Sequence, residues 1–83
     1  MVEIEFDPDK DAINQVKHGV SLVRAADLEE VIVVADGRFG ESRFRLYGLI
    51  DGAWHCAAVT MRGSTVRVIN LRRAHSKEIK RHA

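Results

Sequence analysis

Two glycine-containing turns divide the second half of the chain into three predicted strands. Asp51-Gly52 is a strong β-hairpin signal between segments 44–50 and 54–61, and the turn at 62–64 separates the latter from segment 66–71. Strands joined by hairpins run antiparallel, so these segments predict a meander. Segment 54–61 is apolar on both faces, which is typical of a central strand covered at least in part on both sides.

The first twenty residues predict a strand followed by a helix. Apolar residues alternate with acidic ones over 2–6, which is the period of a half-buried strand. Asp7 is the expected N-cap of the helix, Pro8 its first residue and Gly19 its end. The one narrow apolar face of this helix holds two residues three positions apart, Ile13 and Val16.

A second helix is expected from an N-cap at Ser21 to about Glu30. The β-branched, apolar segment 31–35 follows it, and residues 36–42 contain two glycines and predict a loop or wide turn. The buried stripe of the second helix is expected to hold Leu22, Ala25, Ala26 and Leu28.

The complete pattern belongs to the α+β class. We expect the N-terminal strand and two helices to pack on the antiparallel meander sheet. A short C-terminal helix over 77–82, capped by Ser76, completes the fold. A chain of 83 residues is too short for two cores, so we expect a single domain over residues 1–83.

Composition excludes several classes of protein. The single cysteine, Cys56, can form neither an internal disulfide nor a thiolate zinc cage, and no clustered Cys/His motif is present, so we expect no metal and no cofactor. No apolar run approaches the ~20 residues that cross a bilayer. Met1 is followed by an acidic stretch rather than by a secretory signal, so we expect a cytoplasmic protein with no membrane partner.

Charge is divided unevenly between the two halves of the chain. Residues 1–41 carry ten acids and four bases, a formal charge of −6, whereas residues 42–83 carry nine bases and two acids, a formal charge of +7. Most of these bases are arginine, whose planar guanidinium suits bidentate contact with phosphate. Nucleic acid is therefore the leading class of partner. The alternative is a basic sheet face that packs against the acidic helices of the same domain.

Three arginines of the predicted sheet are the leading phosphate ligands. Arg43 and Arg45 share one face of a strand and Arg67 lies on a neighbouring strand, so all three converge on one phosphate if the register allows. Arg67 is the strongest signal, because an arginine inside a strand of a small domain needs a partner. Its alternative role is a structural ion pair with Glu29 or Glu30.

Arg72 and Arg73 are adjacent, so they point to opposite faces if the strand continues. We favour Arg72 for the site, because it shares parity with Val66, Val68 and Asn70.

Each remaining candidate has a structural alternative. His18, beside Lys17 at a helix C-terminus, is either an acid or base tuned near neutrality or only a helix cap. Arg62 either contacts phosphate or merely suits the hairpin. For six other residues we favour the structural role: His55 in the core, His75 on the solvated surface, Phe44, Tyr47 and Trp54 as core aromatics, and Cys56 as an inert buried thiol.

The chain resembles the BrnT family of type II toxin-antitoxin systems. The resemblance lies in six pieces in the expected order, over roughly residues 4–80: FDPDK, KHGVS, SRFRLYG, the DG hairpin, MRGSTVRVINLRRA and the trailing SKE. It implies a RelE-like toxin fold, an RNA-cleaving activity that inhibits translation, and neutralisation by a BrnA antitoxin. It further implies that this antitoxin is a ribbon-helix-helix DNA-binding protein, which would join two toxins in a 2:2 hetero-tetramer.

Three hypotheses for the function follow. The first is a metal-independent endoribonuclease toxin that acts on RNA, either free or on the ribosome. The others are a non-catalytic RNA-binding or ribosome-binding module, and an interaction module whose basic face docks an acidic helix. For the first we assign catalysis to Arg45, Arg67, Arg72 and His18, and RNA binding to Lys17, Arg43, Arg62, Arg73 and Lys77.

Overall fold

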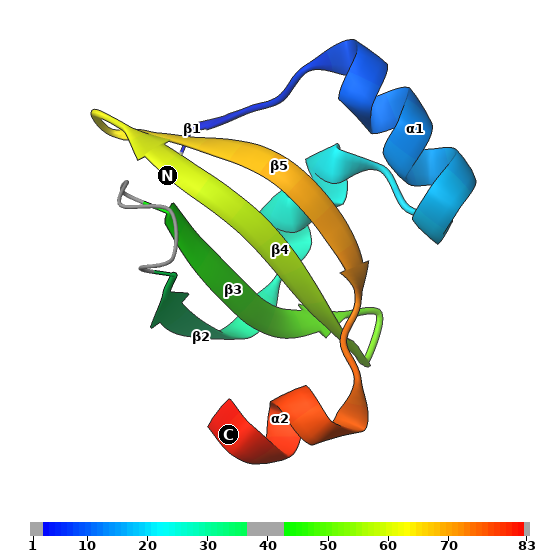
Figure 1. Ribbon diagram of the computed structural model, residues 1–83, viewed down its shortest axis with the longest axis vertical. Helices are drawn as coiled ribbons and strands as arrows, with labels where there is room; N and C mark the ends of the chain where they lie inside the picture. The colour runs from blue at the N-terminus through cyan, green and yellow to red at the C-terminus, as the bar shows by residue number, and fades with distance from the viewer. Residues whose placement is uncertain (1–2, 37–42, 83) are drawn as a thin grey trace.

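Five strands form one sheet in the order β1-β5-β4-β3-β2 (Figure 1). The computed structural model describes residues 3–36 and 43–82, so of the predicted loop at 36–42 only Asp36 lies within the described residues. The strands are β1 (Glu3–Glu5), β2 (Glu29–Ala35), β3 (Arg43–Ile50), β4 (Ala53–Arg62) and β5 (Thr65–Arg73).

Strands β3 to β5 form the predicted antiparallel meander, and β2 adds a fourth antiparallel strand beside β3. Strand β4 is the middle strand of the five. At the β3–β4 turn Asp51 and Gly52 both have positive φ, 51° and 79°, which is the conformation that a two-residue hairpin favours. The prediction that the N-terminal strand packs on an antiparallel sheet is wrong. Strand β1 pairs in parallel with the outer edge of β5, so it lies within a mixed sheet.

Helix α1 (Pro8–His18) begins and ends where the sequence predicts. The Asp7 carboxylate accepts a hydrogen bond from the Asp9 amide at 2.8 Å, and Gly19 adopts the left-handed conformation that ends the helix. The narrow apolar face of α1 nevertheless faces solvent: Ile13 and Val16 are 63% and 91% exposed.

The buried residue of α1 is polar. Asn14 is 5% exposed and forms hydrogen bonds with the backbone of β5 where β1 no longer covers the edge. Its amide donates to the carbonyl oxygens of Leu71 and Val20, both at 2.8 Å. Its side-chain oxygen accepts from the Leu71 amide at 3.3 Å and the Asn70 side chain at 3.4 Å. This asparagine therefore takes the place of a strand residue at the sheet edge, which fixes α1 there.

The predicted second helix is a 3-10 helix, η1 (Leu22–Asp27), and not a longer helix to Glu30. Ser21 is its N-cap, as predicted, but Ala26 of the expected buried stripe is exposed. The chain must leave the helix early because Glu29 already pairs with β3. Leu28 crosses directly over Gly48, where a Cβ would lie 3.1 Å from the Leu28 Cβ, so only glycine fits without displacement.

The core lies between η1 and one face of the sheet. Helix η1 contacts β1, β3 and β5, and Figure 1 shows it behind β4 and β5. Helix α2 (Ser76–His82) follows β5 and begins one residue before the predicted start. The buried apolar residues that contact one another are Leu22, Ala25, Ile50, Ala57, Val59, Val68 and Leu71.

A β-bulge in β5 decides which of its side chains share a face. Val68 pairs with Val59 and Asn70 pairs with Ala58, so Ile69 is an extra residue in β5. The alternation of side chains is therefore reversed beyond Ile69.

A second bulge lies in β2. Leu49 and Tyr47 of β3 are two residues apart, whereas their partners Glu29 and Ile32 are three residues apart. Glu30 takes a positive φ of 54° inside this bulge, a conformation that is unfavourable for residues other than glycine. The side chains of β2 beyond Glu30 therefore also change faces.

We expect Asn14→Leu to lower the free energy of unfolding by about 3 kcal/mol, because it leaves the buried Leu71 amide and carbonyl without partners. Gln15→Ala on the exposed side of the same helix removes only a hydrogen bond to Asp11 and should cost less than about 0.5 kcal/mol. Urea denaturation of both variants checks this. Equal stability of the two would contradict the role given to Asn14.

Candidate nucleic-acid interface

Four arginines lie on the sheet face that points away from η1. They are Arg43 and Arg45 of β3 and Arg67 and Arg72 of β5. Paired residues of neighbouring strands share a face, and Arg43 and Arg67 both pair with Thr60 of β4. Arg72 pairs with Cys56, which also pairs with a residue of β3 on this face. We call this surface the arginine face. The structure thus places all three arginines of the predicted convergence, together with Arg72, on one side of the sheet.

Arg72 lies on the arginine face, but the reason given for choosing it, its shared parity with Val66 and Val68, is wrong. Val66 and Val68 point to the opposite face and pack against the core. Arg72 shares the arginine face with Arg67 only because the bulge at Ile69 reverses the alternation between them.

Helix α2 contributes a carboxylate to this face. Glu78 accepts two hydrogen bonds from the Arg72 guanidinium, at 2.8 and 2.9 Å, and one from the Tyr47 hydroxyl at 3.0 Å. It also accepts from the His75 amide at 3.0 Å, which closes the first turn of α2. Arg45 in turn donates to the Tyr47 hydroxyl at 3.3 Å. One network therefore joins β3, β5 and α2.

The acidic and phenolic groups of this network titrate far from neutral pH. The bidentate contact with Arg72 lowers the pKa of Glu78 from 4.5 to about 2. Burial raises the pKa of Tyr47 to about 12, and the Tyr47 side chain is fully buried. Burial likewise raises the pKa of Cys56, which is a free, buried cysteine, as predicted. At pH 7 Glu78 is therefore a carboxylate, Tyr47 a phenol and Cys56 a thiol.

Arg67 is held more loosely than Arg72. The predicted alternative partners, Glu29 and Glu30, are wrong: the ion pair is with Glu5, its neighbour on β1, at 3.4 Å. The two side chains are 33% and 41% exposed, so the ion pair is open to solvent and to competing anions.

The structure separates several predicted site residues from the arginine face. His18 lines a hollow of about 390 Å³ on the other side, together with His55 and Arg73. Arg73 pairs with His55 and is turned away from Arg72, as the adjacency of the two arginines predicts. His55 is buried with its Nδ1 2.8 Å from the Ala53 carbonyl oxygen, in line with the expected core position. The assignment of His18 to one catalytic site with Arg45, Arg67 and Arg72 is therefore wrong.

The other predicted contacts are on the surface. Arg62 is exposed at the end of β4, two residues beyond Thr60, and so extends the arginine face. Lys17 is exposed on α1 beside the outward-facing Ile13 and Val16. Lys77 is exposed on α2.

Sequence reasoning missed Glu78, Tyr47 and Glu5 as members of the site. Glu78 lies three residues after His75, a spacing that signals a carboxylate closing the first turn of a helix, but nothing local indicates Arg72 as its partner. The contact between Glu5 and Arg67 spans 62 positions and depends on the parallel pairing of β1 with β5.

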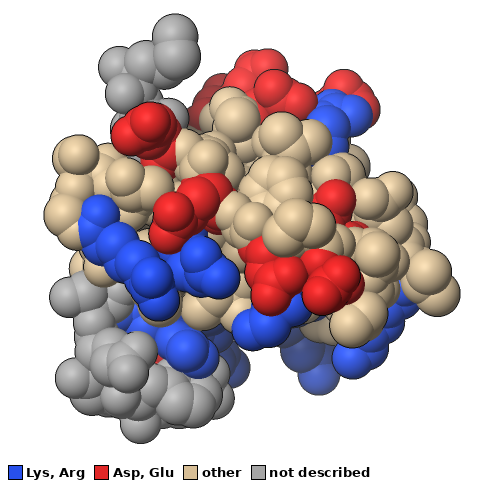
Figure 2. Space-filling view, turned by 90° about the horizontal axis from the view of Figure 1, so that it is seen from above, with Lys and Arg blue, Asp and Glu red and all other residues tan. Residues whose placement is uncertain are grey.

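The arginine face is not covered by the acidic helix α1, because α1 lies at the β5 edge and η1 on the other face. The prediction of a basic face packed against the acidic helices is therefore wrong for these two elements. Figure 2 shows most basic side chains gathered on the lower side of that view, with the acidic ones above them. A basic sheet face that α1 and η1 leave uncovered, and that α2 contacts at Tyr47 and Arg72, suits a polyanion.

Residues 3–36 and 43–82 contain neither a cluster of metal-binding side chains nor a membrane-spanning helix. No group of three or more His, Cys, Asp or Glu side chains in this part of the chain is placed to hold a metal ion. No helix there is long and apolar enough to span a membrane.

The chain is similar to known toxins. A family model described as ribonuclease toxin, BrnT, of type II toxin-antitoxin system matches residues 6–78. Among solved structures, the 1.1 Å crystal structure of the Brucella abortus ribonuclease toxin BrnT matches with a TM-score of 0.73 and 24% identity, over 92% of this chain and 100% of that one. This second likeness concerns the fold. No curated protein matches.

Because the pKa of Glu78 is lowered on folding, its contribution to stability is complete above the ordinary value of 4.5 and is lost as the pH falls towards 2. We expect Glu78→Gln to lower the free energy of unfolding by about 1 to 3 kcal/mol at pH 7, and the difference from the wild type to vanish near pH 2. Denaturant titrations at several pH values measure this. Glu3→Gln, the same change at an exposed site, is the control; a gap that stays constant with pH would refute the linkage.

Proposed function

Since the chain belongs to the BrnT family of ribonuclease toxins of type II toxin-antitoxin systems, we propose that it is an endoribonuclease that cleaves RNA on the arginine face without a metal ion and so inhibits translation. The observation that carries this proposal is the placement of Arg43, Arg45, Arg67 and Arg72 on one face of the sheet, which α1 and η1 do not cover.

The chemistry needs positive charge above all. When the ribose 2′-oxygen attacks the adjacent phosphorus, the bond to the 5′-oxygen breaks and a 2′,3′-cyclic phosphate remains. Negative charge builds up on the phosphoryl oxygens in the transition state, and guanidinium groups stabilise it there. The 2′-hydroxyl proton leaves to a base and the 5′-oxygen takes up a proton. Tyr47 and Glu78 are poor candidates for these transfers at neutral pH, given their shifted pKa values. Positioning and electrostatics are therefore the main contribution of this face.

Two of the arginines are held in place by neighbouring side chains, and a third forms only a weak ion pair. Glu78 fixes Arg72, and the Tyr47 hydroxyl accepts a hydrogen bond from Arg45, so these two guanidinium groups are oriented before RNA binds. The weak, solvent-exposed ion pair of Arg67 with Glu5 is the contact that a phosphate displaces most easily. Arg67 is thus the arginine that we assign to the scissile phosphate.

Membership of this family also implies a protein partner. A type II system pairs its toxin with a protein antitoxin, and we assign here a BrnA-type antitoxin with a ribbon-helix-helix DNA-binding fold in a 2:2 assembly. We assign a single domain of RelE-like architecture, acting in the cytoplasm on free or ribosome-bound RNA.

A second candidate function is RNA or ribosome binding without cleavage. The observation that favours it is the distance of the pKa values of Tyr47 and Glu78 from neutrality, together with the placement of His18 and His55 on the other side of the sheet. The two candidates share the arginine face and differ only in whether the bound RNA is cut.

We expect Arg67→Ala to reduce RNA cleavage by about 100-fold and to relieve the growth arrest caused by the wild type. Arg24→Ala is the matched control, because it removes one positive charge from η1, on the opposite side of the sheet. Cleavage is followed on labelled RNA with and without EDTA, which should make no difference.

Each other outcome is informative. Full cleavage by a folded Arg67→Ala variant would remove this face as the active site. Wild-type protein that binds RNA in a salt-dependent way but leaves it intact, with or without Mg²⁺, would establish the second candidate instead.

A further inference from the structure

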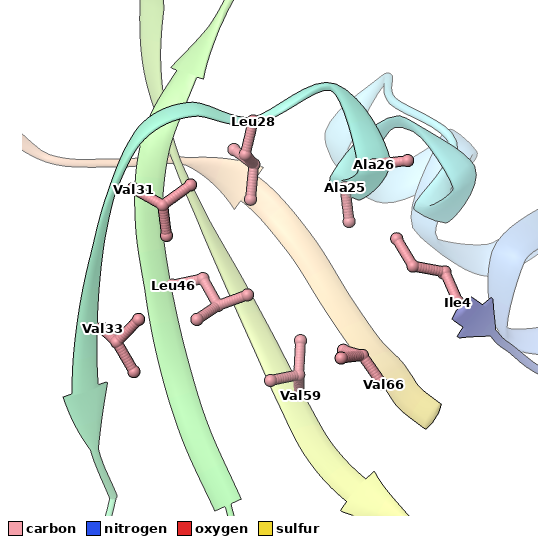
Figure 3. A pocket seen from close by; sticks show the side chains of 9 residues that line it. All are labelled: Ile4, Ala25, Ala26, Leu28, Val31, Val33, Leu46, Val59 and Val66. Carbon is pink, nitrogen blue, oxygen red and sulfur yellow. The ribbon is translucent and has the colours of Figure 1, made fainter. Parts of the chain in front are cut away.

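The sheet face opposite the arginine face carries an apolar groove of about 530 Å³ beside η1 (Figure 3). Its floor comes from the middle strands, one wall from η1 and β1, and the other wall from the edge strand β2. Every lining side chain is aliphatic: Ile4, Ala25, Ala26, Leu28, Val31, Val33, Leu46, Val59 and Val66. We call it the valine groove.

The groove is open to solvent. Val31 and Val33 are 43% and 62% exposed, and a second apolar hollow continues from Val33 past Phe44 to Met61, which is 39% exposed. Contiguous exposed apolar surface of this kind on a small domain marks a binding site.

The bulge in β2 creates this surface. Strict alternation from Glu29 would place Val31 and Val33 on the arginine face, because Glu29 pairs with Leu49 there. The extra residue, with Glu30 at a φ of 54°, turns both valines into the groove instead. An unfavourable backbone conformation is therefore retained at the position that exposes two valines.

A helix fits the groove better than an extended segment. The lining offers aliphatic side chains and no polar side chain, so the backbone of a segment that lies in the groove, away from the outer edge of β2, must satisfy its own amide and carbonyl groups. An amphipathic helix does so and inserts side chains at the spacing i, i+3, i+4 and i+7.

The rim of the groove is acidic. Glu30, in the bulge directly before the lining residue Val31, is exposed. Asp27, at the end of η1, has a side chain that is 57% exposed, although Arg24 offsets part of its charge. Lysine or arginine beside the apolar stripe of the bound helix would complement this rim.

We propose that the valine groove binds an amphipathic helix of the cognate antitoxin, whose apolar stripe is flanked by basic residues. The proposal rests on the proposed function for the existence of that partner. A helix in this groove leaves the arginine face open, so a different segment of the antitoxin must reach the arginines if it is to block them.

The test uses Val33→Glu, in the full chain, with the protein encoded beside this gene as the probe. Toxin-only growth arrest, rescue by the co-expressed probe, and calorimetric titration of purified probe are measured. We expect Val33→Glu to arrest growth like the wild type, to escape rescue, and to bind the probe about tenfold or more weakly. Val16→Glu on α1, which replaces a 91% exposed valine outside the groove, should be rescued normally.

A second variant tests the charge of the rim. Glu30→Lys should bind the probe more weakly, and its affinity should fall less steeply as salt is added. Unchanged binding by Val33→Glu, loss of binding by Val16→Glu alone, or no binding of the probe to the wild type would overturn the proposal.

The occupant and the enzyme activity are tested separately. Self-association of the wild type that Val33→Glu abolishes, without any effect on the probe, would show that a second copy fills the groove and would overturn the antitoxin assignment. A wild type that neither cuts RNA nor arrests growth would remove the proposed function, while the calorimetric comparison would still decide the groove.

Discussion

The outer edge of β5 must find hydrogen-bond partners along its whole length, and much of the N-terminal half is arranged around this need. Strand β1 supplies partners over three residues, and Asn14 supplies them at Leu71. Because these hydrogen bonds hold Asn14 against β5, they also hold α1 in place. Asp11 of the same helix accepts hydrogen bonds from the Leu22 amide and the Ser21 hydroxyl, at 2.7 and 3.0 Å, so the start of η1 is held as well; the contact with the amide lowers the pKa of Asp11. From η1, Arg24 reaches Asp51 in the β3–β4 hairpin at 3.0 Å.

The sheet separates two kinds of surface, and a bulge is responsible for each. The extra residue in β5 brings Arg72 to the side that carries Arg67, and the extra residue in β2 brings Val31 and Val33 to the other side. A regular sheet of the same sequence would mix arginine with valine on both faces. The basic surface and the apolar groove are therefore products of backbone irregularity as much as of composition.

Features that depend on neighbours in sequence could be predicted, and those that depend on distant partners could not. The Asp7 cap, the end of α1 at Gly19 and the Asp51-Gly52 hairpin follow from a few adjacent residues, and the structure confirms them. The arginines were predicted as a set because residue type alone indicates affinity for phosphate. Asn14 was missed because its partner Leu71 lies 57 positions away. Glu78 was missed because its contacts with Arg72 and with Tyr47, 31 positions away, depend on how α2 is placed against the sheet. The bulges were missed because nothing in the local pattern of β2 or β5 marks an extra residue.

The long reach of the Asn14 contact has a consequence for the order in which the chain folds on the ribosome. When α1 emerges from the exit tunnel, the backbone to which Asn14 must bond has not been translated, because Leu71 lies 57 positions after Asn14. The helix is too short to be stable alone in water, so the nascent N-terminal half stays loosely ordered until β5 arrives. The arginines of β3 are ordered later still, because the Tyr47 hydroxyl can contact Glu78 only after the sheet is complete. A nascent chain released before that point carries the arginines without the geometry that orders them.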